Sequence, residues 1–447
     1  MATGTGPLPD RRLSVLDGVA ILVGMVVGIG IFTFPAQVAG ASGSMGAFVG
    51  FWVAGALISL VGALCYAELA SRMPDAGGEY SFLRGAWGEG VGFLFVWARM
   101  AVIQTGAIAL VAYVFGDYAQ SLLPLGPYGS SLYAAAAIIA FTAVNLTGAT
   151  MGARTQALLA GLLVLAATLL AAGALLVGPS PSAPPPPPAT GATTAAGFAM
   201  IFVLLTYGGW NEAAYLAGEL KDERRSMLRV LVFGIIVVGA LYLLLNVAYL
   251  HVLGLGGMAA SKTVAADLAS AVFGQTGGTV MALIVALASL STLNACVFTG
   301  ARAAYAAGRD FPRLGGLGRW NGGRDTPAVA LFIQAAVALV LVIAAALTRK
   351  GVQTMVDYTT PVFWLFLLGV ALALFRLRAT AGPAPFRVPL YPLTPILFAL
   401  ACLFMLKSSL DYNGTGAAFG LLVLALGLPV MAWVRRPPPL AVGRINP

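Results

Sequence analysis

Long apolar stretches separated by short polar segments fill most of the chain between residues 16 and 434. Each stretch is about 20 residues long, enough for a helix to cross a hydrocarbon core of about 30 Å. The pattern predicts an all-α integral membrane protein with twelve transmembrane helices. We expect these spans to begin near Asp17, Gly46, Gly90, Ser131, Gln156, Ala195, Leu228, Asp267, Ala328, Val352, Pro389 and Gly416.

Spans one to five and six to ten can be overlaid as two units of opposite orientation, because five is an odd number of crossings. The sequence predicts a five-plus-five inverted repeat within a single transmembrane domain, 1–447, with repeats at about 15–178 and 195–378 and two further helices at about 389–434. The proline-rich residues 178–194 are expected to form an extended spacer between the repeats. Transporters of this design bind ligands near the midplane, on discontinuous helices at matching positions of both halves.

Helix-breaking residues interrupt the first span of each predicted repeat, so helices 1 and 6 are expected to be discontinuous. The first span contains Gly24, Gly28, Gly30 and Pro35, and the sixth places Gly208 and Gly209 side by side. Adjacent glycines cost roughly 1 kcal/mol each relative to alanine in a helix, and lipid supplies no water for the freed backbone groups. A lone glycine motif more often permits close helix packing, but the matched pair of breaks favours a binding site.

The two breaks would offer a ligand groups of opposite polarity. N–H groups at the start of the second half-helix, at Gly28 and Gly30, attract an anion such as a carboxylate. Carbonyl groups at the end of the other half-helix, at Leu205, Thr206 and Gly208, suit an ammonium or a metal cation. Together they would hold the carboxylate and the amine that all α-amino acids share.

Polar and aromatic side chains adjoin the second break. Tyr207, Trp210 and Asn211 could line the pocket, although aromatic residues in spans are usually packing or interface residues. Glu212 follows directly, and an ionisable group inside a membrane indicates function by default. It could bind a coupling proton, face a cationic substrate, or pair with Arg99 in span three, whose charged end could also reach the cytoplasmic interface.

The distribution of charge predicts the orientation in the membrane. Only 9% of residues are charged and 60% are hydrophobic, far from the roughly one-quarter charged residues of a soluble domain. With a cytoplasmic N-terminus, most of the 25 Lys and Arg residues lie on the cytoplasmic side, and only Lys262, Arg349, Lys350 and Lys407 lie in outer loops. We therefore expect a multi-pass protein of the plasma or inner membrane with both termini cytoplasmic. A net charge of +9 could suggest a nucleic-acid partner, but in a membrane protein the position of each Lys and Arg relative to the spans matters more, so no nucleic-acid partner is expected.

The cysteine and histidine content argues against a metal site or a cofactor. Cys65, Cys296 and Cys402 fall within apolar spans and are interpreted as small buried hydrophobic residues. His251 is the one histidine, whereas a catalytic zinc site needs three protein ligands. A membrane enzyme would need clustered Asp, His or Lys residues, and a channel would need pore-lining rings or filter segments, so a transporter is favoured over both.

Five groups of residues, in register over nearly the whole chain, resemble the amino acid-polyamine-organocation superfamily and within it the L-type amino acid transporter branch and its bacterial relatives. The run Val27-Gly-Ile-Gly-Ile-Phe32 is similar to the family's Gly-Ser-Gly-Ile-Phe signature; the others are residues 65–69 with 74–80, 207–211 with 219–222, 300–310 and 386–392. The resemblance implies alternating access, with Gly28, Ile29 and Gly30 binding the carboxylate. It also implies that Leu205, Thr206 and Gly208 bind the amine.

Three departures from the family pattern bear on function. Ile29 stands where the family has serine, so a hydroxyl contact to the carboxylate is missing. Residues 156–177 lack the lysine that many members carry at a sodium-like position, which leaves ion coupling unassigned. Residues 117–130 lack the cysteine through which mammalian relatives bind a single-span partner, so no disulfide-linked heavy chain is expected.

Taken together, these features predict a secondary active transporter that moves amino acids by alternating access. Because Glu212 is the only acid among the pocket candidates, the substrate is expected to be a neutral amino acid or a broad range of them. Transport would run either as exchange or as proton-coupled symport. The alternative is a transporter of cationic amino acids or polyamines.

Overall fold

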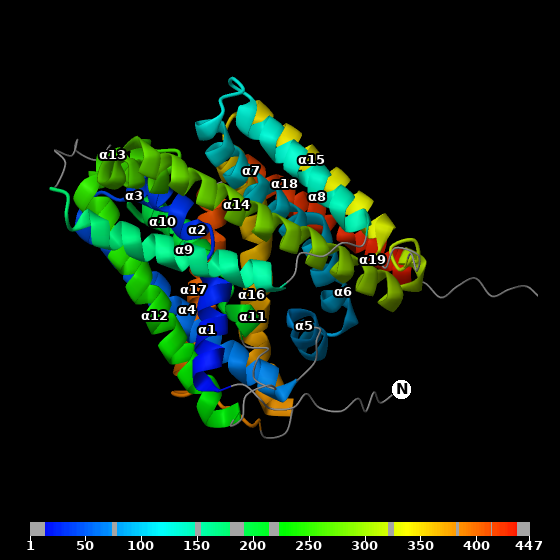
Figure 1. Cartoon of the computed structure of the whole chain (residues 1–447). Helices are drawn as coiled ribbons and strands as arrows, with labels where there is room; N and C mark the ends of the chain where they lie inside the picture. Colours follow the sequence, from blue (N-terminus) through cyan, green and yellow to red (C-terminus); the bar gives the residue numbers. More distant parts are fainter. Residues whose placement is uncertain are drawn as a thin grey trace, which may run out of the picture.

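Figure 1 shows a bundle of helices in the computed structural model. The structure describes residues 14–73, 78–147, 153–178, 192–213, 223–320, 326–380, 384–412 and 414–435. Within these residues, nine helices are long and apolar enough to cross a membrane. Three shorter apolar helices, Val15–Val26, Leu158–Ala174 and Thr194–Thr206, occupy the places of spans one, five and six. The predicted all-α, multi-span fold is confirmed.

The elements run in the following order along the chain. The first half contains α1 (Val15–Val26), α2 (Gly30–Thr33), α3 (Pro35–Ala41), α4 (Met45–Arg72), α5 (Glu79–Trp87), α6 (Glu89–Ala98), the π-helix η1 (Arg99–Ile103), α7 (Gln104–Leu122), α8 (Gly129–Leu146) and α9 (Ala153–Ala174). The second contains α10 (Ala192–Thr206), α11 (Trp210–Ala213), α12 (Glu223–Val252), α13 (Gly254–Ala260), α14 (Val264–Asp310), the 3₁₀ turn η3 (Pro312–Leu314), α15 (Ala328–Thr348) and α16 (Gly351–Thr380). Helices α17 (Leu393–Tyr412), α18 (Gly414–Ala425) and α19 (Gly427–Arg435) complete the chain.

Helices that would be equivalent in the two predicted repeats pack against each other. α4 packs on α12, α7 on α14 and α8 on α15, while α10 contacts α2 and α3, and α11 contacts α1. An inverted repeat built around a common axis produces pairs of this kind. The repeat remains a prediction, and residues 179–191 of the proline-rich segment lie outside the described residues.

The eighth span begins later than the apolar pattern predicts. Gly274 interrupts α14 with φ of 73° and ψ of −177°, so the helix is sharply kinked there. A positive φ is readily adopted only by glycine. The predicted start near Asp267 therefore belongs to a short helical segment before the kink, and the long apolar part of α14 follows it.

Local sequence signals fix where the first helices start. Ser14 and Asp17 form a capping box at α1, in which the Ser14 backbone N–H donates to Asp17 Oδ2 over 2.9 Å. Ser44 caps α4 by accepting from the Ala47 N–H over 3.1 Å. Pro35 occupies the first turn of α3, where its missing N–H costs no hydrogen bond.

A buried carboxylate joins α4 to the segment that follows α16. Glu68 is fully buried and accepts from Arg72 Nη2 over 2.7 Å and from the Val388 backbone N–H over 2.7 Å. Arg378 Nε lies 3.5 Å from the same carboxylate. Residues 386–392 were singled out in the sequence only because they resemble a family motif. In the structure they contribute a backbone donor, the Val388 N–H, to a buried polar cluster.

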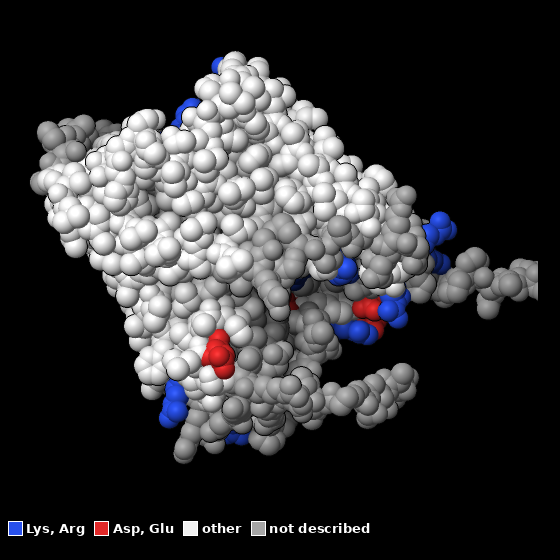
Figure 2. Space-filling view, viewed as in Figure 1, with Lys and Arg blue, Asp and Glu red and all other residues white. Residues whose placement is uncertain are grey.

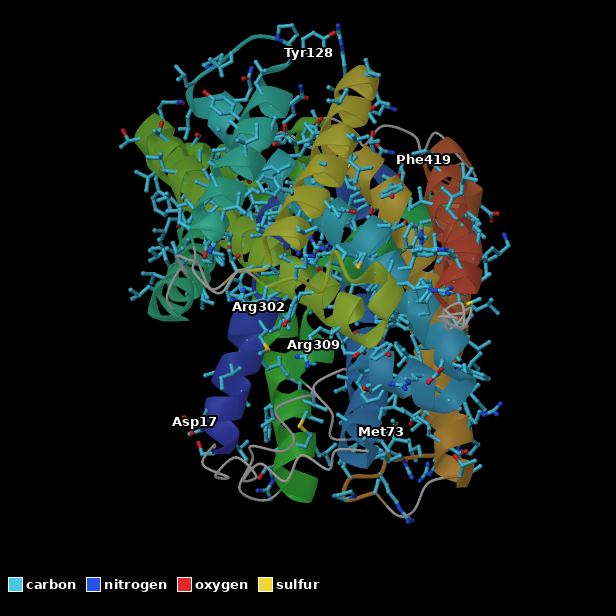
Figure 3. The ribbon with its side chains drawn as sticks, turned by 90° about the vertical axis from the view of Figure 1, so that its right-hand side faces the viewer. Asp17, Met73, Tyr128, Arg302, Arg309 and Phe419 are labelled. Carbon is cyan, nitrogen blue, oxygen red and sulfur yellow. The ribbon has the colours of Figure 1, made fainter. Side chains whose placement is uncertain are left out.

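Most of the charged side chains visible in Figure 2 lie in the lower half of the molecule. Figure 3 places Asp17 and Met73 at the end opposite Tyr128. On the face seen in Figure 2, red and blue atoms concentrate near α1 and toward α5, α6 and α19, with small blue groups at the upper edge. The surface between them on this face is uncharged and suits contact with lipid.

Candidate functional site

The first predicted break lies where the sequence places it. α1 ends at Val26, and Val27 is extended, with φ of −74° and ψ of 91°. Ile29 precedes α2, whose first residue is Gly30. Because the first N–H groups of a helix have no partner within it, this segment presents backbone donors.

The second break is a three-residue turn between α10 and α11. Gly208 N–H donates to Leu205 O over 3.2 Å, and Gly209 adopts a positive φ of 107°. The Thr206 hydroxyl donates to Phe202 O over 2.7 Å and is thereby engaged within its own helix. At this break, as at the first, the groups left to meet a ligand are those of the backbone.

The two breaks are in direct contact. A Cβ atom added at Gly30 would lie 3.1 Å from Thr206 Cα, and one added at Gly209 would lie 2.6 Å from Met25 O. Glycines on each side thus allow the backbones of helices 1 and 6 to meet. The start of one half-helix and the end of another therefore lie together.

Tyr242, on α12, is a residue that sequence reasoning missed. Its hydroxyl lies 2.8 Å from Val26 O and 3.2 Å from Thr206 O, the carbonyl groups at the ends of α1 and α10. The side chain is fully buried. One tyrosine hydroxyl therefore lies within hydrogen-bond distance of both breaks and shares its single proton between their carbonyl groups. Nothing in its apolar surroundings in the sequence distinguishes it.

Tyr242→Phe should weaken the coupling between the two breaks while preserving the packing of the ring. Loss of one shared hydrogen bond corresponds to about 1 kcal/mol. We expect a several-fold change in the substrate concentration for half-maximal uptake in proteoliposomes, with an unchanged elution profile in detergent. Unaltered uptake kinetics would show that the shared hydrogen bond has no role in binding.

Tyr207 and Trp210, two predicted lining residues, are packed into the helix bundle. Tyr207 is fully buried and donates to Trp52 O over 3.2 Å. The Trp210 ring lies 5.2 Å from that of Tyr66 and 5.9 Å from that of Phe398. In this structure both rings support the second break through packing, the usual role of aromatic residues in spans.

Buried tyrosines close the break on the side of α3. Tyr118 donates to Phe32 O over 2.5 Å, and Tyr249 donates to Ile31 O over 3.3 Å. The Phe34 and Phe202 rings lie 5.4 Å apart, and α13 packs on α3. This end of the site is filled by side chains.

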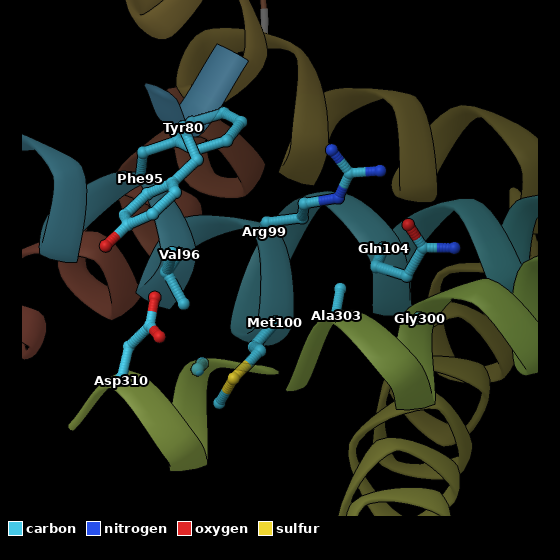
Figure 4. Close-up of a pocket in the computed structure, with 10 residues that line it drawn as sticks. Tyr80, Phe95, Val96, Arg99, Met100, Gln104, Gly300, Ala303 and Asp310 are labelled. Carbon is cyan, nitrogen blue, oxygen red and sulfur yellow. The ribbon is translucent and has the colours of Figure 1, made fainter. Parts of the chain in front are cut away.

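A cavity of about 210 Å³ lies between α6, η1 and α14. Figure 4 shows Arg99 and Gln104 toward one side of it and Asp310 toward the other. Arg99 begins the π-helix, an element frequent at functional sites. Burial raises the pKa of the Tyr80 phenol, which lines the same cavity, and the charge of Asp310 raises it further.

Arg99 of the third span pairs with Glu79 of α5. Arg99 Nη1 lies 3.6 Å from Glu79 Oε2, and Asn211 Nδ2 donates to Glu79 Oε1 over 3.0 Å. Glu79 thereby links the third span to α11, directly after the second break. The Glu212 side chain lies outside the described residues.

Comparison with known proteins identifies relatives over nearly the whole chain. The "b(0,+)-type amino acid transporter 1" of Rattus norvegicus is 30% identical over 407 residues, covering 89% of this chain and 82% of that protein. The "Large neutral amino acids transporter small subunit 2" of Oryctolagus cuniculus is 29% identical over 454 residues, covering 97% and 83%. Because the second relative is named a small subunit, the comparisons do not support the expectation of no heavy chain.

The family model described as "Amino acid permease" matches residues 13–423. This range contains both helix breaks, Tyr242 and the Glu79 contacts. It is a family of transporters, which agrees with the predicted transporter and not with an enzyme. The chain belongs to the amino acid permease family.

Proposed function

We propose that this permease carries neutral amino acids, large ones included, and holds them by the backbone of its two broken helices. The observation that carries the proposal is the direct contact of the breaks, Gly30 against Thr206 and Gly209 against Met25. The start of one helix and the end of another provide complementary partial charges for a zwitterion. The name of the rabbit relative, a large neutral amino acid transporter, supports the substrate class.

Each end of the substrate has a proposed set of partners. N–H groups of Gly28, Ile29 and Gly30 receive the carboxylate. The carbonyls of Leu205, Thr206 and Gly208 receive the ammonium; Leu205 O accepts from Gly208 N–H, and its second lone pair remains for a ligand. Selectivity then depends on the substrate side chain, and cationic amino acids or polyamines facing Glu212 are the alternative.

Alternating access by exchange is the proposed mode. Support comes from the buried Tyr118 and Tyr249 contacts, which close the site toward α3, while the Arg99 cavity lies on the side of α5. We therefore assign this structure to the state in which the substrate site is open toward α5 and closed toward α3. Preloaded unlabelled amino acid should accelerate uptake of labelled amino acid into proteoliposomes; accumulation driven by a pH gradient alone would instead support proton-coupled symport.

We further propose a cell-membrane location with both termini cytoplasmic. Arg302 and Arg309 lie in the half of Figure 3 that also contains Asp17 and Met73, as the positive-inside rule would place them. The packing of α4 on α12 and of α7 on α14 supports the inverted repeat at about 15–178 and 195–378. With this orientation and an inverted repeat, the proposed carboxylate and amine sites would lie near the membrane midplane.

A partner subunit is in keeping with the name of the rabbit relative. Cys65 and Cys402 are buried and Cys296 is partly buried, within α4, α17 and α14. We propose that such a subunit packs against this chain without a disulfide. An assembly isolated in mild detergent should then survive a reducing agent.

Gly28→Ala tests the carboxylate site without disturbing the fold. A Cβ atom at Gly28 would meet only Val26 O, at 4.0 Å, so the helix bundle can accept the methyl group. The methyl would stand beside the proposed donors, and loss of one hydrogen bond to a charged ligand, about 1.5–3 kcal/mol, raises KM by roughly tenfold or more.

Gly24→Ala is the matched control, because nothing lies within 4 Å of its added Cβ. KM for uptake and thermal stabilisation by each of the twenty amino acids would be measured for wild type and both variants. An unchanged KM in Gly28→Ala, or failure of every amino acid to stabilise the wild type, would reject the proposed site.

A further inference from the structure

Three of the four cations in predicted outer loops converge on one cavity. Lys262, Arg349 and Lys350 line a cavity of about 260 Å³. They come from two separate connections, before α14 and between α15 and α16. Because the positive-inside rule depletes outer loops of Lys and Arg, membrane orientation gives no reason for such a concentration.

The cavity lies at the end of the molecule opposite the N-terminal helix. Tyr128, one of its lining residues, is labelled in Figure 3 far from Asp17. Thr33 and Gln37, from α2 and α3, also line it. The cavity therefore borders the same short half-helix whose start, Gly30, is the proposed carboxylate site.

The positive charge of the cavity is not neutralised by close ion pairs. In the described parts of the chain no carboxylate forms a salt bridge with Lys262, Arg349 or Lys350, whereas Lys407 pairs with Asp411. The Arg349 guanidinium lies 5.5 Å from the centre of the Tyr128 ring.

Two acids act on these cations at longer range. Asp117 lines the cavity, is hydrogen-bonded to Ser130 and is attracted electrostatically by Lys262. Asp357, on α16 outside the lining, feels the charge of Lys350. The lining thus holds three cations and one carboxylate, so its net charge is positive. The Asp117 carboxylate is an acceptor for a cationic group.

We propose that this cavity is an outer docking site for the transported amino acid, with its carboxylate at the three cations and its ammonium toward Asp117. The inference rests on the proposed function and orientation. A positive cavity raises the local concentration of carboxylates and the rate of encounter, in a manner that salt screens. Docking here precedes transfer past α2 and α3 to the break at Gly30.

The test compares KM on the two sides of the membrane in proteoliposomes. The combined Lys262→Gln, Arg349→Gln and Lys350→Gln variant should show a KM for uptake from the outer side about tenfold above wild type at low salt. KM on the inner side and the maximal exchange rate should be unchanged. Added salt should raise the outer KM of the wild type and leave that of the variant unaltered.

Lys407→Gln serves as the matched control, because it removes the fourth predicted outer cation, which lies on α17 and outside this cavity. It should leave both KM values at wild-type levels. If the combined variant fails to fold, Arg349→Gln and Lys350→Gln are measured singly and should each shift only the outer KM. An equal shift on both sides, no shift, or an equal effect of Lys407→Gln overturns the docking site.

Two further measurements distinguish failure of the docking site from failure of the proposed orientation or of the proposed function. Leu123→Cys, in the exposed connection between α7 and α8, should react with an impermeant maleimide on the side where KM changes. Reaction on the opposite side would overturn the docking site even if KM changed. A wild type without saturable amino acid uptake would reject the proposed function itself, which the maleimide reaction does not depend on.

Discussion

Gly209→Ala is expected to abolish transport, because it drives the two helix breaks apart. Gly209 has a φ of 107°, a backbone conformation that costs other residues about 1–3 kcal/mol. The added Cβ would lie 2.6 Å from Met25 O and 3.1 Å from Met25 C, so it collides with backbone and not with a flexible side chain. Overpacking typically adds about 1–3 kcal/mol more.

Uptake per amount of folded protein is the measurement, with the elution profile in detergent recorded alongside. Gly24→Ala, on the same broken helix pair but with open space around its Cβ, should retain wild-type uptake. Near-normal transport by Gly209→Ala would show that close contact of the breaks is not needed for the cycle.

Gly209→Ala and Gly28→Ala separate the two functions of glycine at this site. At Gly209 the methyl group has no room in the resting structure, so assembly of the breaks fails. At Gly28 the methyl group meets only Val26 O, at 4.0 Å, so the fold persists and the effect is confined to the ligand. A loss of affinity without loss of fold is the result expected from a backbone binding site.

The breaks could be predicted from the sequence because glycine and proline within an apolar run are local signals. Glycine is unfavourable inside a helix, and the helices are interrupted at the glycines of both breaks: Gly28 and Gly30 in the first, Gly208 and Gly209 in the second. Their mutual contact could be inferred only from the matching positions in two halves. The expectation that the breaks lie close together came from the predicted inverted repeat, not from any one motif.

Contacts that depend on tertiary structure alone could not be predicted. Tyr242 lies in an apolar span like many others, and its shared hydrogen bond exists only because α12 passes both breaks. Pairing with Arg99 was one of three roles that the sequence allowed for Glu212. Nothing in the sequence indicated Glu79, which α5 brings to within 3.6 Å of Arg99.

The cations of the predicted outer loops are a second example of a contact that the sequence could not predict. Lys262, Arg349 and Lys350 served in the sequence only as markers of membrane orientation. The convergence of two connections on one cavity is a property of the folded chain.

Glu68→Ala is expected to lower stability more than any surface charge change, by about 3–5 kcal/mol, the range for breaking a buried ion pair. The fully buried Glu68 carboxylate accepts from Arg72 Nε over 2.9 Å and from the Val388 N–H over 2.7 Å, and Arg378 lies 3.5 Å away. Alanine removes the acceptor that these groups share and leaves a cavity under α4.

The matched control is Glu89→Ala, which breaks the ion pair to Arg84 at 3.0 Å, with side chains 68% and 49% exposed. Exposed pairs contribute about 0–1 kcal/mol, so the control should shift the unfolding temperature in detergent only slightly. Glu68→Gln, which keeps two polar groups of similar size, should recover part of the loss. Equal shifts for Glu68→Ala and Glu89→Ala would mean that the Glu68 cluster contributes no more than a surface pair. A large difference would show that the buried Glu68 cluster holds the segment after α16 to α4.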